Sequence, residues 1–161
     1  MESPEDLLTL ENQLCFALVT AARNVVSIYR PILEPLGLTH PQYLVMLALW
    51  ERSPRSLGEL ADELALEPAT LSPLVKRLEA QGLVTRSRRV EDERVLDVVL
   101  TDAGRALRTR ALAVPGQVME TVGTDAASLV ALRDALAPFA GRRAGLRGER
   151  TAAGTRVGGR T

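Results

Sequence analysis

The sequence predicts a mainly α-helical fold with a small β-hairpin. Apolar residues recur with a helical period over residues 5–30. Two further short helical segments are separated by a proline-containing break at residues 66–68. Two β-prone stretches, 83–88 and 95–100, flank a charged loop. Helices therefore account for most of the chain, and the two strands follow one another directly as a hairpin.

The composition is that of a single globular domain. The chain has 161 residues, of which 46% are hydrophobic and 25% are charged. It contains no run of about 18 apolar residues, and its N-terminus opens acidic, without the basic-then-apolar layout of a signal peptide. Its single cysteine, Cys15, excludes an intrachain disulfide framework. We therefore expect a cytoplasmic protein with no membrane partner and no bound metal.

Residues 5–30 are predicted to form one long helix. The apolar residues from Leu7 to Tyr29 follow a helical period. Pro31 is expected to end this helix, because proline inside a helix removes a hydrogen bond and clashes with the preceding turn. A helix of this length needs a surface to cover its apolar face, and a partner subunit is a natural candidate.

Three shorter helices are expected next. The first covers residues 41–52 and is strongly apolar. Ser56 and Glu59 have the spacing of a capping box, which opens the second helix over 56–65. The third helix runs from about residue 69 to residue 81.

The second half of the chain is predicted to hold the hairpin, two helices and a tail. These elements are strands at 83–88 and 95–100, helices at 102–113 and 124–139, and a tail at 141–161. Pro115 and Gly116 are expected to interrupt the chain between the two helices. The tail holds six arginines and one acid with few large apolar side chains, so we expect it to be disordered and basic.

Two short helices joined by a tight turn and followed by a hairpin with a charged tip describe a winged helix-turn-helix. The second helix of such a pair lies in the major groove of DNA. Here it carries Thr70 and Ser72 near its start, which can reach base edges or phosphates, and Lys76 and Arg77 one turn on, where phosphate contact is favoured. The predicted domains are dimerisation helices at 1–35 and 102–140, a DNA-binding domain at 36–101 and the tail at 141–161.

The hairpin supplies a second set of candidate DNA contacts, Arg86, Arg88 and Arg94. Asp92 lies two residues before Arg94, which predicts an ion pair within the loop that orients the arginine. An arginine at a hairpin tip suits insertion into a narrow minor groove, where the negative potential is strongest. A solvated charged hairpin is the alternative, and the coincidence of helix pair and hairpin favours DNA binding.

Three pieces between Leu57 and Leu107 carry a family resemblance: LVKRLEAQGLVTR, DER and LTDAGRAL. With them the chain resembles the MarR family of dimeric bacterial regulators over roughly residues 7–140. The resemblance implies a homodimeric repressor whose terminal helices pair and whose two winged helices bind a palindromic double-stranded operator. No catalytic motif is recognisable, so we expect a regulator, not an enzyme, without a cofactor.

Two further segments, NQLCFAL and PQYLVMLALWE, are similar to the OhrR branch of this family, which senses organic hydroperoxides. The similarity implies that Cys15 is the redox sensor and that Tyr29, Tyr43 and His40 belong to the sensing site. An ordinary free thiol is only about 3% thiolate at pH 7, so a fast sensor needs hydrogen bonds or positive charge at the sulfur. Tyr29 lies about 21 Å from Cys15 along a straight helix. The two side chains therefore cannot touch within one straight helix. In the branch that the chain resembles, a tyrosine at this position is donated to the cysteine across the dimer.

Oxidation of Cys15 would give a sulfenic acid that has no second cysteine in the chain to resolve it. The next product would be a mixed disulfide with a small thiol, or an over-oxidised sulfur. Either adds bulk to a helix–helix interface and could move the two DNA-reading heads apart. The chain departs from the branch at Val19 and His40, where the branch usually has tyrosines.

Two alternatives to redox sensing stay open. In the first, Cys15 is a buried small hydrophobe, as most free cysteines are. A small aromatic acid bound between the dimerisation helices and the winged domain would then release the DNA. In the second, the protein is a thiol enzyme that turns over peroxide, which the absence of a resolving cysteine and of a peroxidase motif argues against.

Overall fold

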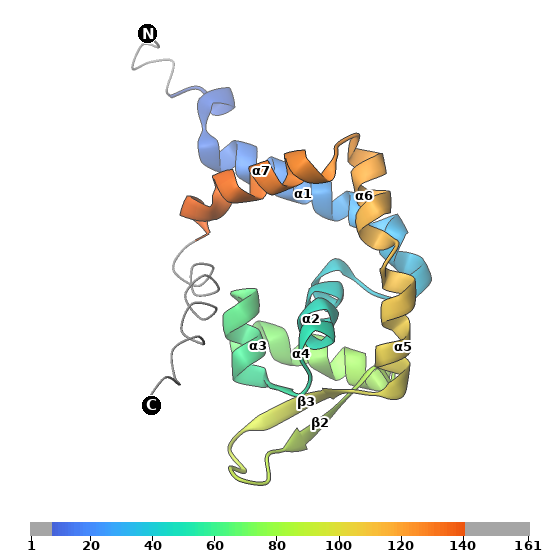
Figure 1. Cartoon of the computed structure of the whole chain (residues 1–161). Helices are drawn as coiled ribbons and strands as arrows, with labels where there is room; N and C mark the ends of the chain where they lie inside the picture. The colour runs from blue at the N-terminus through green and yellow to red at the C-terminus, as the bar shows by residue number, and fades with distance from the viewer. Residues whose placement is uncertain (1–7, 141–161) are drawn as a thin grey trace, which may run out of the picture.

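A computed structural model describes residues 8–140 of the chain, and the predicted tail at 141–161 lies outside the described residues. The described part is mainly helical with a small antiparallel sheet, as predicted (Figure 1). The helices are α1 (Leu14–Leu33), α2 (His40–Glu51), α3 (Leu57–Leu64), α4 (Pro68–Ala80), α5 (Asp102–Ala111), α6 (Val114–Val122) and α7 (Ala126–Leu136). The strands are β1 (Arg55–Ser56), β2 (Val84–Arg88) and β3 (Leu96–Leu100), and short 3-10 turns cover Leu10–Asn12, Glu34–Leu36 and Ala137–Phe139.

The first long helix differs from its prediction at both ends. It begins at Leu14, after a 3-10 turn, and it continues through Pro31 to Leu33. The prediction that Pro31 ends the helix is therefore wrong. Proline removes one helical hydrogen bond, and the extra turn places Leu33 in the core with no exposed surface, which offsets that loss.

Helices α2, α3 and α4 and the hairpin follow the predicted order, and a second capping box accompanies the predicted one. Thr39 and Gln42 cap α2, and Ser56 and Glu59 cap α3. The sheet has the strand order β1-β3-β2, so the hairpin gains a short third strand that the sequence analysis did not anticipate. This strand carries Arg55, which is buried and pairs with Glu51 and Glu63.

The C-terminal part contains one helix more than predicted. Thr101 caps α5 by accepting a hydrogen bond from the Gly104 amide. Pro115 does not lie in a break between helices as predicted. It lies in the first turn of α6, where the missing N–H removes no helical hydrogen bond. Asp125 then caps α7.

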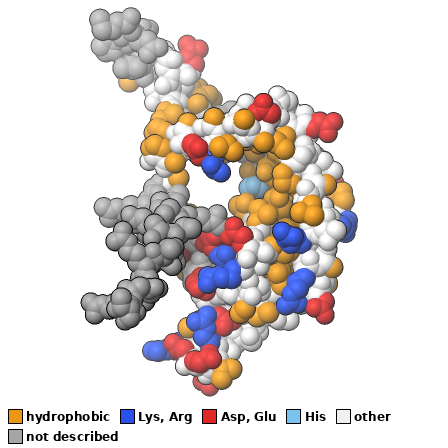
Figure 2. All heavy atoms as spheres, viewed as in Figure 1, with side chains coloured by type: hydrophobic (Ala, Val, Ile, Leu, Met, Phe, Trp, Pro, Cys, Tyr) orange, Lys and Arg blue, Asp and Glu red, His pale blue; other side chains and the backbone are white. Residues whose placement is uncertain are grey.

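The buried core lies mainly between α2, α3 and α4 and the sheet. Met46, Leu49, Leu60 and Val98 are its fully buried centre. Helices α1 and α7, which we call the arch, contribute little to this core, because large apolar side chains on them face solvent (Figure 2). Within the described residues no helix is long and apolar enough to cross a membrane.

Candidate DNA-binding surface and thiol site

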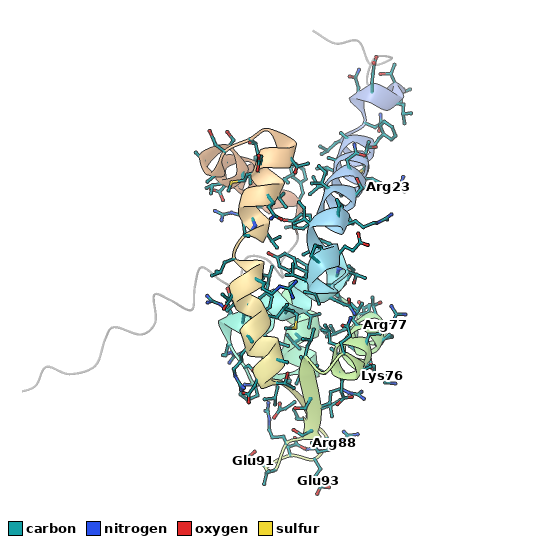
Figure 3. All side chains as sticks on the ribbon, turned by 90° about the vertical axis from the view of Figure 1, so that its right-hand side faces the viewer. Arg23, Lys76, Arg77, Arg88, Glu91 and Glu93 are labelled. Carbon is teal, nitrogen blue, oxygen red and sulfur yellow. The ribbon has the colours of Figure 1, made fainter. Side chains whose placement is uncertain are left out.

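The second helix of the pair, α4, presents the side chains predicted to read DNA. Leu71, Val75 and Leu78 are buried, and this spacing places one face of α4 on the core. Thr70, Lys76 and Arg77 are exposed, and Ser72 is half-buried near the helix start. Figure 3 shows Lys76 and Arg77 projecting from α4 above Arg88 on the hairpin.

The hairpin tip contains the predicted ion pair. Asp92 Oδ1 accepts hydrogen bonds from both the backbone N–H and the Nε of Arg94, each at 3.1 Å. These bonds hold the pKa of Asp92 below its ordinary value. The Arg94 side chain remains 91% exposed, so the carboxylate orients the guanidinium without covering it. Arg88 donates to the Glu93 carbonyl across the loop at 3.2 Å.

Two other arginines, Arg86 within β2 and Arg89 just after its end, are held by carboxylates. Arg89 forms a two-pronged pair with Asp97 on β3, at 3.0 and 2.6 Å. Arg86 contacts Glu79 of α4 at 2.8 Å, and its side chain is only 25% exposed. Of the predicted DNA contacts on the hairpin, Arg88 and Arg94 are therefore exposed, and Arg86 is engaged by a neighbouring helix. This pairing could not be predicted from the sequence, because it depends on how α4 packs against β2.

The predicted redox residues fall into two places. Tyr29, His40 and Tyr43 form an aromatic cluster, with ring centroids 4.8 Å apart for Tyr29–His40 and 5.9 Å apart for Tyr29–Tyr43. Burial raises the pKa of both tyrosines and lowers the pKa of His40. Cys15 lies in the first turn of α1, at the other end of that helix from Tyr29, and is exposed. One chain alone therefore does not bring the thiol to the cluster.

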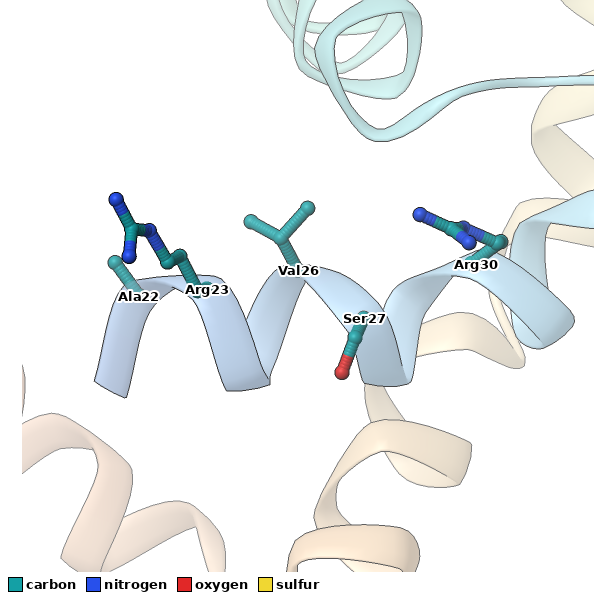
Figure 4. A pocket seen from close by; sticks show the side chains of 5 residues that line it. All are labelled: Ala22, Arg23, Val26, Ser27 and Arg30. Atoms are coloured by element: carbon teal, nitrogen blue, oxygen red, sulfur yellow. The ribbon is translucent and has the colours of Figure 1, made fainter. Parts of the chain in front are cut away.

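A groove of about 870 Å³ runs between α1, the start of α2 and the end of α4. Its lining includes His40 of the aromatic cluster, the cations Arg30 and Arg77, and the amide side chain of Gln81. Sequence patterns do not reveal this set, because its members come from α1, the start of α2 and the end of α4. A shallower hollow of about 310 Å³ continues along α1, over Arg23, Val26 and Arg30 (Figure 4).

Residues 8–140 contain no group of three or more His, Cys, Asp or Glu side chains that could hold a metal ion.

Residues 38–96 match the MarR family. The chain is 40% identical over 136 residues to the organic hydroperoxide resistance transcriptional regulator of Bacillus subtilis, covering 84% of this chain and 92% of the relative. A solved structure of reduced AbfR bound to DNA is similar with a TM-score of 0.65 and 37% identity, over 70% of this chain and 78% of that one. CouR from Rhodococcus jostii, solved with p-coumaroyl-CoA, is similar with a TM-score of 0.70 and 26% identity, over 84% and 96% of the two chains.

Proposed function

Because this chain belongs to the MarR family of DNA-binding transcriptional regulators, we propose that it is a cytoplasmic homodimeric repressor that senses organic hydroperoxides through Cys15 and then releases its operator. One observation carries the proposal. The sole cysteine of the sequence lies exposed in the first turn of α1, in a chain 40% identical to an organic hydroperoxide resistance regulator.

The DNA-binding role rests on the exposed polar side chains of α4 and the hairpin. Thr70 and Ser72 at the start of α4 would approach base edges or phosphates. Lys76 and Arg77 would bind phosphates, and the carboxylate-oriented Arg94 would enter the minor groove. A palindromic operator would present two such half-sites to the two winged domains.

The dimer rests on the apolar surface that one chain leaves uncovered. Leu14, Phe16 and Val19 on α1 and Val130 and Leu132 on α7 are all between 46% and 56% exposed. Helices with exposed apolar faces of this extent are stable in water when a partner covers them. Antiparallel pairing of the first helices of two subunits would bring each Cys15 toward the aromatic cluster of the other subunit.

The proposed sensing step is a two-electron oxidation of sulfur. The Cys15 thiolate attacks one oxygen of the hydroperoxide, so that an S–O bond forms, the O–O bond breaks and the alcohol leaves after taking up a proton. The sulfenic acid then condenses with a small thiol, forming a mixed disulfide and releasing water. The added group would occupy space between subunits and alter the distance between the two α4 helices.

Operator release measured with and without oxidant tests the proposal. Binding to promoter DNA of the protein's own gene is compared for reduced protein and for protein treated with an organic hydroperoxide and a small thiol, with Cys15→Ser in parallel. We expect oxidation to release the wild type, dithiothreitol to restore binding, and the variant to stay bound. If both proteins stay bound, or if both respond alike, Cys15 is not the switch.

The groove beside the aromatic cluster favours a second candidate function, release by a small aromatic acid. Its volume of about 870 Å³ suits a small molecule, and Arg30 and Arg77 would offset a carboxylate. CouR, a neighbour in fold, was solved with p-coumaroyl-CoA. A Cys15→Ser protein that an aromatic acid still releases fully from DNA would support this function.

A further inference from the structure

We propose that Glu79 and Arg86 form a clasp that fixes the recognition helix α4 against the wing, the β2–β3 hairpin, and that Arg86 supports operator binding by positioning and not by touching DNA. The inference rests on the DNA-binding part of the proposed function and is independent of Cys15.

The clasp uses both oxygens of one carboxylate. Glu79 Oε1 accepts a hydrogen bond from the backbone N–H of Arg86 at 2.9 Å. Glu79 Oε2 accepts from the Arg86 Nε at 2.8 Å and lies 2.8 Å from the terminal guanidinium nitrogen. One side chain of α4 is thus joined to the backbone and to the side chain of one residue of β2, which fixes distance and orientation together.

The backbone bond matters because β2 is an edge strand. Among the described strands, whose order is β1-β3-β2, this strand pairs only with β3, and Arg86 lies opposite Val98 in that ladder. Amide groups on the outer side of an edge strand have no strand neighbour. Glu79 supplies the missing acceptor for Arg86, so the wing is joined to α4 where the sheet alone would leave it open.

The clasp also closes the turn that connects the two elements. The chain passes from α4 to β2 through Gly82, whose φ of +74° is the left-handed conformation that favours glycine. Thr101 secures the same turn by donating from its hydroxyl to the Gly82 carbonyl and from its amide to the Leu83 carbonyl. Glu79 and Arg86 join the two sides of this turn and limit rotation of the wing about it.

Charge distinguishes Arg86 from the exposed cations of this surface. Its guanidinium is paired with a carboxylate whose pKa is lowered by the hydrogen bonds from Arg86, so the pair stays ionised at neutral pH. Arg88 and Arg94 of the wing are exposed, whereas Arg86 is half-buried. A phosphate bound by Arg86 would have to displace Glu79 or lie against its negative charge, which disfavours direct contact.

Glu79→Gln should change the operator affinity in opposite directions, depending on whether Glu79 acts only through its charge or by holding the wing in place. Removing a negative charge close to DNA strengthens binding when the residue acts only through the electrostatic field. If Glu79 holds the wing in place, the variant instead weakens operator binding about three- to tenfold, the range expected for losing part of a charge-assisted hydrogen bond. Glu91→Gln, an exposed acid on the same hairpin, is the matched control and should bind equally or more tightly.

Arg86→Gln separates positioning from phosphate contact. We expect it to weaken operator binding as Glu79→Gln does, with an unchanged dependence of log affinity on log salt and with little further loss in the double variant. A phosphate contact would instead reduce that slope by about one. Tighter binding by Glu79→Gln, or a slope reduced in Arg86→Gln, would overturn the proposal.

Hydrogen exchange on the free protein tests the clasp without DNA. The Arg86 amide should exchange faster in Glu79→Ala, which lacks the acceptor oxygen, than in wild type, while amides in α2 keep their protection and show that the fold is intact. Unchanged protection at Arg86 would overturn the clasp even if DNA binding changed. If wild-type protein binds no promoter DNA, the proposed function fails, and this exchange measurement still decides whether the clasp exists.

Discussion

Gly104 lies where α5 approaches the start of β2, and its lack of a side chain is required there. A Cβ atom at this position would lie 2.1 Å from the Leu83 carbonyl oxygen, which is backbone and cannot move aside. The Gly104 carbonyl also accepts a hydrogen bond from the Trp50 indole at 2.9 Å. The two contacts place α2, α5 and the sheet at a fixed separation.

Gly104→Ala should therefore lower the free energy of unfolding by about 1–3 kcal/mol, the usual cost of overpacking. Gly116→Ala is the matched control, because nothing lies within 4 Å of the added methyl group in α6. That variant should be neutral or stabilised by up to about 1 kcal/mol through helix propensity. Urea unfolding of both variants gives the comparison, and equal stability of the two would contradict the tight approach seen here.

His40, the only histidine of the sequence, should make stability depend on pH just below neutrality. Burial lowers its pKa below the ordinary value of 6.5, so the folded protein keeps the ring neutral at a pH where the unfolded chain protonates it. The unfolding free energy should accordingly fall as pH decreases through 6.5. Denaturation at pH 7.5 and 5.5 measures this fall, which should shrink in His40→Gln. An equal fall in both proteins would assign it to other groups.

Single residues also show how far the sequence could predict the site. The Asp92–Arg94 pair is a contact between near neighbours in the chain, so spacing alone was enough to predict it. The Glu79–Arg86 pair joins two elements across a turn and needed the packing of α4 on β2. Whether Arg86 itself contacts DNA is the one of these predictions that the salt dependence of Arg86→Gln would test, and the other predicted DNA contacts stay predictions.

At the scale of elements, the two capping boxes set where α2 and α3 begin. In α3 the Ser56 hydroxyl accepts from the Glu59 amide at 3.1 Å, and the Glu59 carboxylate accepts from the Ser56 amide at 2.8 Å. The backbone hydrogen bond from Ser56 is the main reason that the pKa of Glu59 is lowered. Helix α3 has only eight residues, so a larger part of its stability depends on its cap.

Ser56→Ala should lower the free energy of unfolding by about 1 kcal/mol, a typical value for the loss of an N-cap. Ser27→Ala is its control, because the Ser27 hydroxyl is exposed and only donates back to the Asn24 carbonyl of its own helix. The control should change stability by less than about 0.5 kcal/mol. Thermal and urea unfolding of the two variants would refute the role of the cap if their midpoints coincide.

Elements with a strong local pattern were predicted, and elements set by packing were not. Periodicity and caps gave α2, α3, α4, α5 and both hairpin strands within a few residues. Strand β1 has two residues, which is too short for a pattern, and it forms because β3 offers an edge. Both proline predictions were wrong because they treated every proline as a helix breaker. Pro115 lies in a first turn, where proline is tolerated. Pro31 lies inside α1, where the turn that follows it gains burial.

At the scale of the whole molecule, the apolar side chains of the arch, α1 and α7, are left uncovered in one chain. The two helices, blue and orange in the colours of Figure 1, stand apart in Figure 3. Both carry exposed apolar side chains, with Val19 at 47% and Leu132 at 56%. A second copy of the chain that covers both helices would bury this surface and set the distance between two α4 helices.

Leu132→Asp should therefore dissociate the protein into monomers at micromolar concentration, because a charge in a dimer interface must be desolvated. Operator binding should weaken at least about tenfold, since two half-sites are no longer bound by one linked unit. Val90→Asp, on a fully accessible apolar residue of the hairpin, should leave the dimer intact. Sedimentation equilibrium gives the oligomeric state, and a dimeric Leu132→Asp would place the interface elsewhere.

The same pair of variants tests whether sensing needs two subunits. Within one chain Cys15 and the Tyr29–His40–Tyr43 cluster lie at opposite ends of α1, so a tyrosine can assist the thiol only from a partner. Monomeric Leu132→Asp should then lose Cys15 thiol to an organic hydroperoxide several-fold more slowly than dimeric Val90→Asp, as followed by thiol titration. Equal rates would mean that the sulfur reacts without help from the other subunit, and that the dimer only transmits the oxidation to the DNA-binding domains.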